Sequence, residues 1–265
     1  MKRLLAAMPL VMATVASAAA ADMPLKAAPV VPVYNWTGFY LGINAGESFG
    51  KNNVDFAQLG SPGVAAGPDI DLGSFTAGGQ IGYNWQTGIW VFGVEADIDW
   101  RNRSDSATYL APATLGVGGA PFLSVGGDTA VFSAEQDWLG TVRGRLGTTY
   151  GTNGSGLFYV TGGWAYGDVK HSVFEFLVAP GSANNRFISD SSNKSGWTIG
   201  GGTEFRFAGP WSVGIEYLYV DLGRSTLNFP TQTIGGTVFA ADTTTFHDTS
   251  HLFRAKLNYK FGPYY

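Results

Sequence analysis

Two histidines near the C-terminus are the first residues whose spacing could serve chemistry. His247 and His251 flank Asp248 and Ser250, and imidazole nitrogens are common ligands of metals and haem. A spacing of four would bring both rings onto one face of a helix. This segment instead begins a stretch with strand periodicity, where the same spacing separates the rings by about 13 Å. We interpret both as solvated loop residues and keep them as weak candidates for haem binding.

Aspartate or serine beside histidine could also indicate a hydrolase. Asp97, Asp99, His247 and Ser250 would be its residues. The absence of cysteine excludes thiolate metal sites, cysteine nucleophiles and disulfides. The glycine run at 200–202 lies inside a strand pattern, which favours close backbone packing over phosphate binding. We therefore expect no catalytic residue, no metal and no cofactor, and predict that the protein is not an enzyme.

The N-terminus has the layout of a secretory signal peptide. Two basic residues precede an apolar run from residue 4 to about residue 16, and alanines before Asp22 offer a cleavage site. The run is shorter than the roughly 20 residues that a membrane-spanning helix needs. We expect residues 1–21 to be a cleaved signal peptide, 22–35 a proline-rich periplasmic linker and 36–265 the folded domain.

The composition is unusual for a water-soluble protein. Only 14% of residues are charged, against about 25% in typical domains, while 14% are aromatic and 38 are glycine. No later segment approaches 18 continuous apolar residues, so only strands could cross a membrane. Loss of the two basic residues in the signal peptide changes the formal net charge from −4 to −6, which argues against nucleic acid as a partner.

From Trp36 onward, polar and apolar residues alternate with the period of two that characterises strands. Eight segments follow this pattern: 39–46, 75–86, 90–100, 138–150, 158–166, 197–207, 211–219 and 253–261. Short turns at 86–88, 151–156 and 208–210 alternate with long polar connections at about 47–73, 101–136, 168–195 and 221–250. This layout predicts an all-β fold, an eight-stranded antiparallel up-and-down transmembrane β-barrel with short periplasmic turns and long extracellular loops.

The two faces of these segments decide between two kinds of barrel. A soluble lipocalin-like barrel is apolar inside, whereas a membrane barrel is apolar outside. Charged and amide side chains fill one face here, which is incompatible with an oily ligand cavity. Aromatic residues gather beside the short turns, as a membrane interface selects: Trp36, Tyr83, Trp85, Trp90, Phe92, Phe207, Trp211, Tyr259 and Phe261.

The strand phases direct acidic and basic side chains together into the lumen. An eight-stranded interior is just wide enough for side chains to fill, and unpaired buried charges are costly, so we expect ion pairs and a plugged lumen. We also expect arginine at Val142 or Ile215, on the lipid face, to be more damaging than at Thr141 or Gly214. The expected network comprises Glu95, Asp97, Asp99, Arg143, Arg145, Glu204, Arg206, Glu216, Arg254 and Lys256, with Lys260 beside it.

Four strand motifs resemble a known family. They are WTGFYLG at 36–42, WLGTVRGRLG at 138–147, YVTGG at 159–163 and EYLYVDLG at 216–223. In combination they are similar to the small outer-membrane β-barrel proteins of alphaproteobacteria, the group of the Brucella surface antigens and of proteins called porin family. One departure is the C-terminus, where Phe261 is followed by four further residues instead of ending the chain.

The resemblance implies a surface-exposed barrel in the outer membrane that contributes to envelope integrity or surface contact. Its expected partners are outer-membrane lipid, lipopolysaccharide and the barrel-assembly machinery, and any extracellular ligand is expected to contact the loops. Three function classes stay open: a structural or surface-interaction barrel, a narrow porin-like channel and a haem-binding receptor.

Overall fold

Eight long strands dominate the part of the chain that the computed structural model describes, which is residues 34–58, 64–66, 70–110, 129–179, 182–234, 237–239 and 241–263. The expected signal peptide and most of the expected linker lie outside these residues. The long strands are β1 (Gly38–Gln58), β3 (Ile70–Thr87), β4 (Trp90–Leu110), β5 (Thr129–Tyr150), β6 (Gly156–Ala179), β7 (Ser182–Ala208), β8 (Trp211–Phe229) and β11 (Asp242–Lys260). The short elements are β2 (Val64–Ala66), β9 (Gln232–Ile234), β10 (Thr237–Phe239) and the 3-10 turn η1 (Thr152–Gly154).

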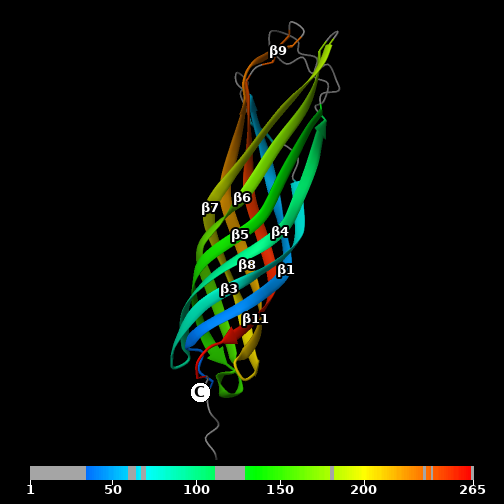
Figure 1. The fold of residues 1–265 in the computed structure, drawn as a ribbon. Coiled ribbons are helices and arrows are strands. Elements are labelled where there is room, and N and C mark those ends of the chain that lie inside the picture. Colours follow the sequence, from blue (N-terminus) through cyan, green and yellow to red (C-terminus); the bar gives the residue numbers. More distant parts are fainter. Residues whose placement is uncertain are drawn as a thin grey trace, which may run out of the picture. The chain divides into compact units, whose positions relative to one another are not determined.

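The long strands form a closed ring. Each pairs antiparallel with its neighbour in chain order, and β11 pairs with β1 to complete the circle. At this closure Ala45 of β1 pairs with Ala77 of β3 on one side and with Ala255 of β11 on the other, so the ring of paired strands is continuous. Figure 1 shows the tilted strands with their short turns at the end where the C-terminus is labelled. The eight-stranded antiparallel barrel predicted from the sequence is confirmed. No helix within the described ranges is long and apolar enough to cross a membrane.

The outer wall of the ring is apolar. Ile43 and Ile215 are about two thirds exposed, although both would be core residues in a water-soluble domain. Aromatic side chains form one belt beside the short turns, including Trp85, Trp90, Phe207, Trp211 and Phe261, and a second belt farther along the strands, including Phe75, Trp100, Trp164, Trp197 and Phe253. Two aromatic belts around an aliphatic band are what lipid and its two interfaces require.

The strands continue well beyond the loop boundaries expected from the sequence. β6 and β7 pair from Gly156↔Phe205 to Ala179↔Ser182, so the expected loop at 168–195 is mostly a hairpin. The other three expected loops are likewise shortened by the extensions of β1, β3, β4, β5, β8 and β11. The strands continue because polar and apolar residues still alternate in these segments, with the polar residues on the outward face.

The polarity of the wall inverts past the second aromatic belt. On β7 the outward residues change from exposed Ile199 to exposed Ser191 and Ser195, while the inward Ile188 packs on a hydrophobic core. Irregular register in two ladders accompanies this change, between Trp100 and Arg103 and between Glu135 and Leu139. The carboxylate of Asp168 accepts the backbone N–H groups of Asp137 and Trp138 in the second bulge, at 3.1 and 3.0 Å. The irregularity on β5 moves its buried positions from odd-numbered to even-numbered residues, whereas β7 keeps one parity throughout.

Beyond the same belt the ring separates into two sheets. The β7–β8 ladder ends at Trp197↔Asp221 and the β3–β4 ladder ends at Thr76↔Arg101, although all four strands continue. The other ladders extend to the far ends of their strands. One sheet therefore contains β3, β1, β11 and β8, and the other contains β4, β5, β6 and β7. We call this two-sheet part of the barrel the extension.

The interior is more apolar than the sequence analysis expected. A hydrophobic core fills the extension between its sheets, with Val54, Phe132, Ala134, Val173, Leu227, Phe229 and Phe246 buried together. A second apolar layer lies within the ring: Leu139, Ala165, Val169, Leu218, Val220, Leu222 and Leu252. The large charge network thus lies in the part of the ring nearer the short turns, while a few charged or titratable residues, among them Arg101, His171, Arg186 and Asp248, are buried farther along.

Candidate functional site

A buried ion-pair network occupies the lumen, and Glu95 on β4 is at its centre. Its carboxylate accepts hydrogen bonds from Arg143 Nη2 at 2.6 Å and from Lys256 Nζ at 2.7 and 2.8 Å. Arg145 Nη1 lies 3.2 Å from it, and the phenol of Tyr40 donates at 2.6 Å. One carboxylate therefore joins strands on opposite parts of the ring.

A second group of contacts surrounds Arg254 on β11. Its guanidinium contacts Asp97 at 3.0 Å, Asp99 at 2.6 Å and Glu216 at 2.7 Å. Arg143 bridges this group to the first, because it reaches Asp97 at 2.6 Å and Glu216 at 3.1 Å. These side chains are fully buried. Removing one partner would leave an uncompensated charge away from water.

Arg145 connects the network to a further carboxylate, that of Glu204. Its Nη2 lies 2.5 Å from Glu204 on β7, and its guanidinium stacks 3.9 Å from the centre of the Tyr159 ring. Tyr159 donates to Glu216 at 2.9 Å. A Cβ at Gly202 would lie 2.7 Å from the Tyr159 hydroxyl oxygen, so the glycine run leaves room for this phenol and for close strand packing.

The sequence analysis missed several members of this lining and misplaced one. Tyr40, Tyr159 and Thr141 lie on the inward face with the expected charges. Their positions in the alternating pattern of their strands could have identified them as inward residues. Arg206 does not lie within the network as expected: it sits at the short-turn mouth, where its Nε donates to the Gly209 carbonyl at 2.9 Å and its guanidinium covers the ring of Tyr34. Lys260 also lies over that ring.

A plug of two aromatic residues closes the short-turn end. Tyr34 and Trp36 precede β1 and are buried, although Tyr34 falls within the segment expected to be linker. Tyr34 donates its backbone N–H to the Asn153 carbonyl at 2.8 Å, and Trp36 Nε1 donates to the Gly154 carbonyl at 3.0 Å. Asn153 has a φ of 61°, which turns the β5–β6 connection toward the plug. Burial raises the pKa of Tyr34 to about 12, so its phenol stays neutral.

The space left between plug and network is very small. A cavity of about 10 Å³ lies between Tyr34, Trp36, Tyr40 and Glu204, which is room for about one water molecule. The carboxylates of Glu95, Asp97 and Glu216 above it are paired with arginine, lysine and hydroxyl donors. They are therefore poorly suited to act as a general base or to bind a substrate.

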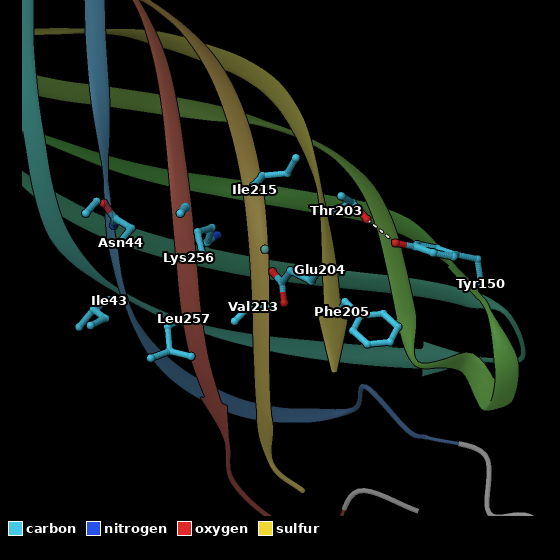
Figure 2. A pocket seen from close by; sticks show the side chains of 13 residues that line it. Ile43, Asn44, Tyr150, Thr203, Glu204, Phe205, Val213, Ile215, Lys256 and Leu257 are labelled. Atoms are coloured by element: carbon cyan, nitrogen blue, oxygen red, sulfur yellow. Dashed lines mark hydrogen bonds between the residues drawn. The ribbon is translucent and has the colours of Figure 1, made fainter. Parts of the chain in front are cut away.

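A larger cavity lies on the outer wall and not in the lumen. It has a volume of about 630 Å³ and is lined by outward residues of β1, β11, β8 and β7. Figure 2 shows Tyr150 reaching across to Thr203, to which it is hydrogen-bonded at 2.7 Å. The polar side chains of Glu204 and Lys256 come from the same strands but are buried in the ion-pair network. This cavity is an apolar groove in the lipid-facing band.

The three histidines occupy different environments. His247 lies 3.4 Å from Asp221, and His251 shares a 2.7 Å hydrogen bond with the Tyr217 phenol among outward aromatic rings. Neither is a free loop residue, and they do not share a visible ligand site. His171 on β6 is buried and lies 3.0 Å from Asp248, between the two apolar layers. Across the described ranges no three acidic or histidine residues gather as a metal site would need.

Comparisons with known proteins find a matching family model and similar relatives. Residues 7–261 match the family described as outer membrane protein beta-barrel domain. The chain is 35% identical to the 31 kDa outer-membrane immunogenic protein of Brucella melitensis, covering 92% of this chain and 94% of the relative. It is 31% identical to the 22 kDa outer membrane protein of Rhizobium leguminosarum, covering 73% and 68%. Among solved structures, OprG from Pseudomonas aeruginosa matches with 13% identity and a TM-score of 0.48, over 87% of this chain and 99% of that one.

Proposed function

Because this chain belongs to the outer membrane protein beta-barrel domain family, we propose that it is a closed, non-conducting barrel that holds a rigid β-sheet extension at the cell surface. The relatives' names give the outer membrane as its location. In this role it contributes to envelope integrity and to surface contact. Its partners in the envelope are lipid, lipopolysaccharide and the machinery that assembles barrels.

The observation that carries this proposal is the filled lumen. Ion pairs of Glu95, Arg143 and Arg254 cross the ring, and Tyr34 with Trp36 covers its short-turn end. An ion that entered would have to displace both the plug and a set of buried, mutually paired charges. Two apolar layers farther along the interior add a further barrier to hydrated ions.

Planar bilayer recording of the purified protein tests the proposal. We expect no stable conductance from the native barrel, and none of porin size from Trp36→Ala, because the ion-pair network still fills the ring. A channel-forming porin recorded in the same membrane is the positive control. Steady porin-sized steps from the native barrel would overturn the proposal and favour the channel.

A second experiment tests the role in the envelope. Cells that lack this protein should become more sensitive to detergent, and the native gene should restore resistance. A variant that folds but has the extension shortened by removal of residues 172–189 should restore detergent resistance as well, because the membrane-spanning ring is intact. Unchanged sensitivity of the deletion strain would argue against a contribution to envelope integrity.

A further inference from the structure

The outer wall of the ring is hollowed where β1, β11, β8 and β7 lie side by side. One row of paired outward residues crosses these strands, from Ala45 through Ala255 and Ile215 to Thr203. Three of these four side chains are small. The neighbouring rows carry large ones, which are Ile43, Leu257, Val213 and Phe205 toward the short turns and Phe253 and Tyr217 toward the second belt.

The small row is therefore the floor of a groove between two ridges. The cavity of about 630 Å³ described above lies over this floor. A second cavity of about 500 Å³ adjoins it, and both are lined by Thr203, Ile215 and Ala255. We call the two together the wall groove. Each volume is within the range of about 300–1,000 Å³ that is typical of small-molecule sites.

Tyr150 closes the groove on the β7 side. Its ring crosses β6 over Gly156, where a Cβ would lie 2.4 Å from the ring, so glycine is needed at this position. Its hydroxyl lies 2.7 Å from the Thr203 hydroxyl, as Figure 2 shows. Because these two hydroxyls are partners of each other, the groove needs no polar group from a ligand. Its surface is suited to a hydrocarbon chain.

The surroundings of the groove identify its occupant. The groove lies in the aliphatic band between the two aromatic belts, where a bilayer offers acyl chains and no water. It crosses four strands, a length of about 15 Å because neighbouring strands are about 4.8 Å apart. Strands of such barrels tilt by about 35–45°, so a groove across them is inclined in the membrane. A narrow, flexible chain can follow this path.

We propose that the wall groove binds an acyl chain of one glycerophospholipid of the periplasmic leaflet. Phe205 and Val213 line the groove, and each lies two positions from Phe207 and Trp211 of the belt beside the short turns. A chain that enters from this belt belongs to the leaflet on the short-turn side, which is the phospholipid leaflet of an outer membrane. The inference rests on the proposed function only for this orientation of the barrel.

A second copy of this chain fits the groove poorly. The wall of a barrel is convex, so two barrels touch along a line and leave an inclined depression between them unfilled. Filling the depression needs an occupant that is thin over its whole length. An acyl chain meets this requirement, and the bilayer supplies it at high concentration.

Native mass spectrometry of the full-length barrel, extracted from outer membranes in mild detergent, tests the proposal. We expect one phospholipid to stay on the native barrel and to be lost from Ala255→Phe, whose ring would fill the floor of the groove. Ala96→Phe is the matched control and should keep the phospholipid, because Ala96 faces outward on β4, away from the groove lining.

Three results of this experiment would overturn the proposal. The first is a native barrel without a phospholipid, or equal retention by the two variants. The second is lipopolysaccharide in place of phospholipid, which would assign the chain to the other leaflet. The third is a mass of two barrels that Ala255→Phe abolishes, which would identify a second copy as the occupant.

Photo-crosslinking in vesicles separates a binding site from general contact with lipid. The probe is a phospholipid with a diazirine in one acyl chain. We expect more adducts on Val213 than on Val94 or Val142, although Val213 is 44% exposed and the other two are 51% and 52% exposed on the opposite strands β4 and β5. Adducts in proportion to exposure would overturn the proposal. Neither experiment depends on whether the lumen conducts, so its failure is distinct from failure of the proposed function.

Discussion

The indole Nε1 of Trp36 donates a 3.0 Å hydrogen bond to the carbonyl of Gly154, which ties the segment before β1 to the turn between β5 and β6. These two residues are 118 positions apart in the chain. The backbone N–H of Trp36 also donates to the side chain of Gln86 at 2.7 Å. The plug therefore links three parts of the ring that are far apart in sequence.

Trp36→Ala should destabilise the barrel by about 3–5 kcal/mol, because it removes a buried indole and leaves a cavity. The free energy of unfolding in lipid vesicles, measured by urea titration, checks this. Trp85→Ala is the control, since Trp85 is about half exposed on the outer wall. A similar loss for both variants would show that the plug contributes no more than an interfacial aromatic.

Arg143→Ala should also cost about 3–5 kcal/mol, because Glu95 and Asp97 would lose a buried partner. Arg224→Ala provides a control, since Arg224 lies exposed in the extension. The same urea titration measures both. An effect of Arg143→Ala no larger than that of Arg224→Ala would contradict the contacts assigned to the network.

Ile215→Arg should cost about 2–4 kcal/mol, whereas Thr226→Arg should cost almost nothing. Both residues face outward on β8, but only Ile215 lies in the apolar band between the belts. Folding yield into vesicles and urea titration compare the two variants. Equal penalties would place the membrane boundary beyond Thr226 and argue against the polarity inversion.

The sequence analysis expected arginine to be tolerated better at the inward positions Thr141 and Gly214 than at lipid-facing positions, but the structure leaves little room for it there. Thr141 is buried and donates to Asp97 at 2.7 Å, and a Cβ at Gly214 would approach Glu204 Cγ to 2.7 Å. Arginine at Thr141 or Gly214 should therefore be damaging through overpacking. The comparison of Ile215→Arg with Thr226→Arg uses two outward positions, so overpacking of the lumen does not affect it.

Phe246→Ala should loosen the extension while leaving the ring intact. Phe246 is buried between the sheets and stacks 4.3 Å from His171, so its loss should cost about 3–5 kcal/mol of local stability. Hydrogen exchange followed by mass spectrometry should show faster exchange in β6 and β7 above the second belt only. Phe253→Ala, on the outward face of the same strand, should leave this pattern unchanged.

Much of the ring could be predicted because strand periodicity is strict. Once Glu95 is inward on its strand, Asp97 and Asp99 must be inward as well, and Ile98 must face lipid. The pairing of individual charges could not be predicted. Lys256 reaches Glu95 across the lumen from β11 to β4, and that contact depends on the tilt and stagger of the whole ring.

The extension escaped prediction because its pattern is weak. Val169, His171 and Val173 alternate with Asp168 and Lys170, but the segment is polar enough to read as a loop. On β5, the irregular register between Glu135 and Leu139 moves the inward positions from odd-numbered to even-numbered residues, so they cannot be extrapolated along that strand. Along β6 the buried residues stay odd-numbered from Tyr159 to Val173, and this unbroken parity places His171 inward.

The separation of the extension into two sheets changes what evolution can do with each half of the protein. In a closed ring, strand number, tilt and stagger are coupled, so a one-residue insertion in any strand disturbs every ladder. In the extension that coupling ends, because the β7–β8 ladder stops at Trp197 and the β3–β4 ladder stops at Thr76. Insertions there need only preserve the contact between two sheets, so the surface half can diverge in length and sequence while the membrane half stays fixed.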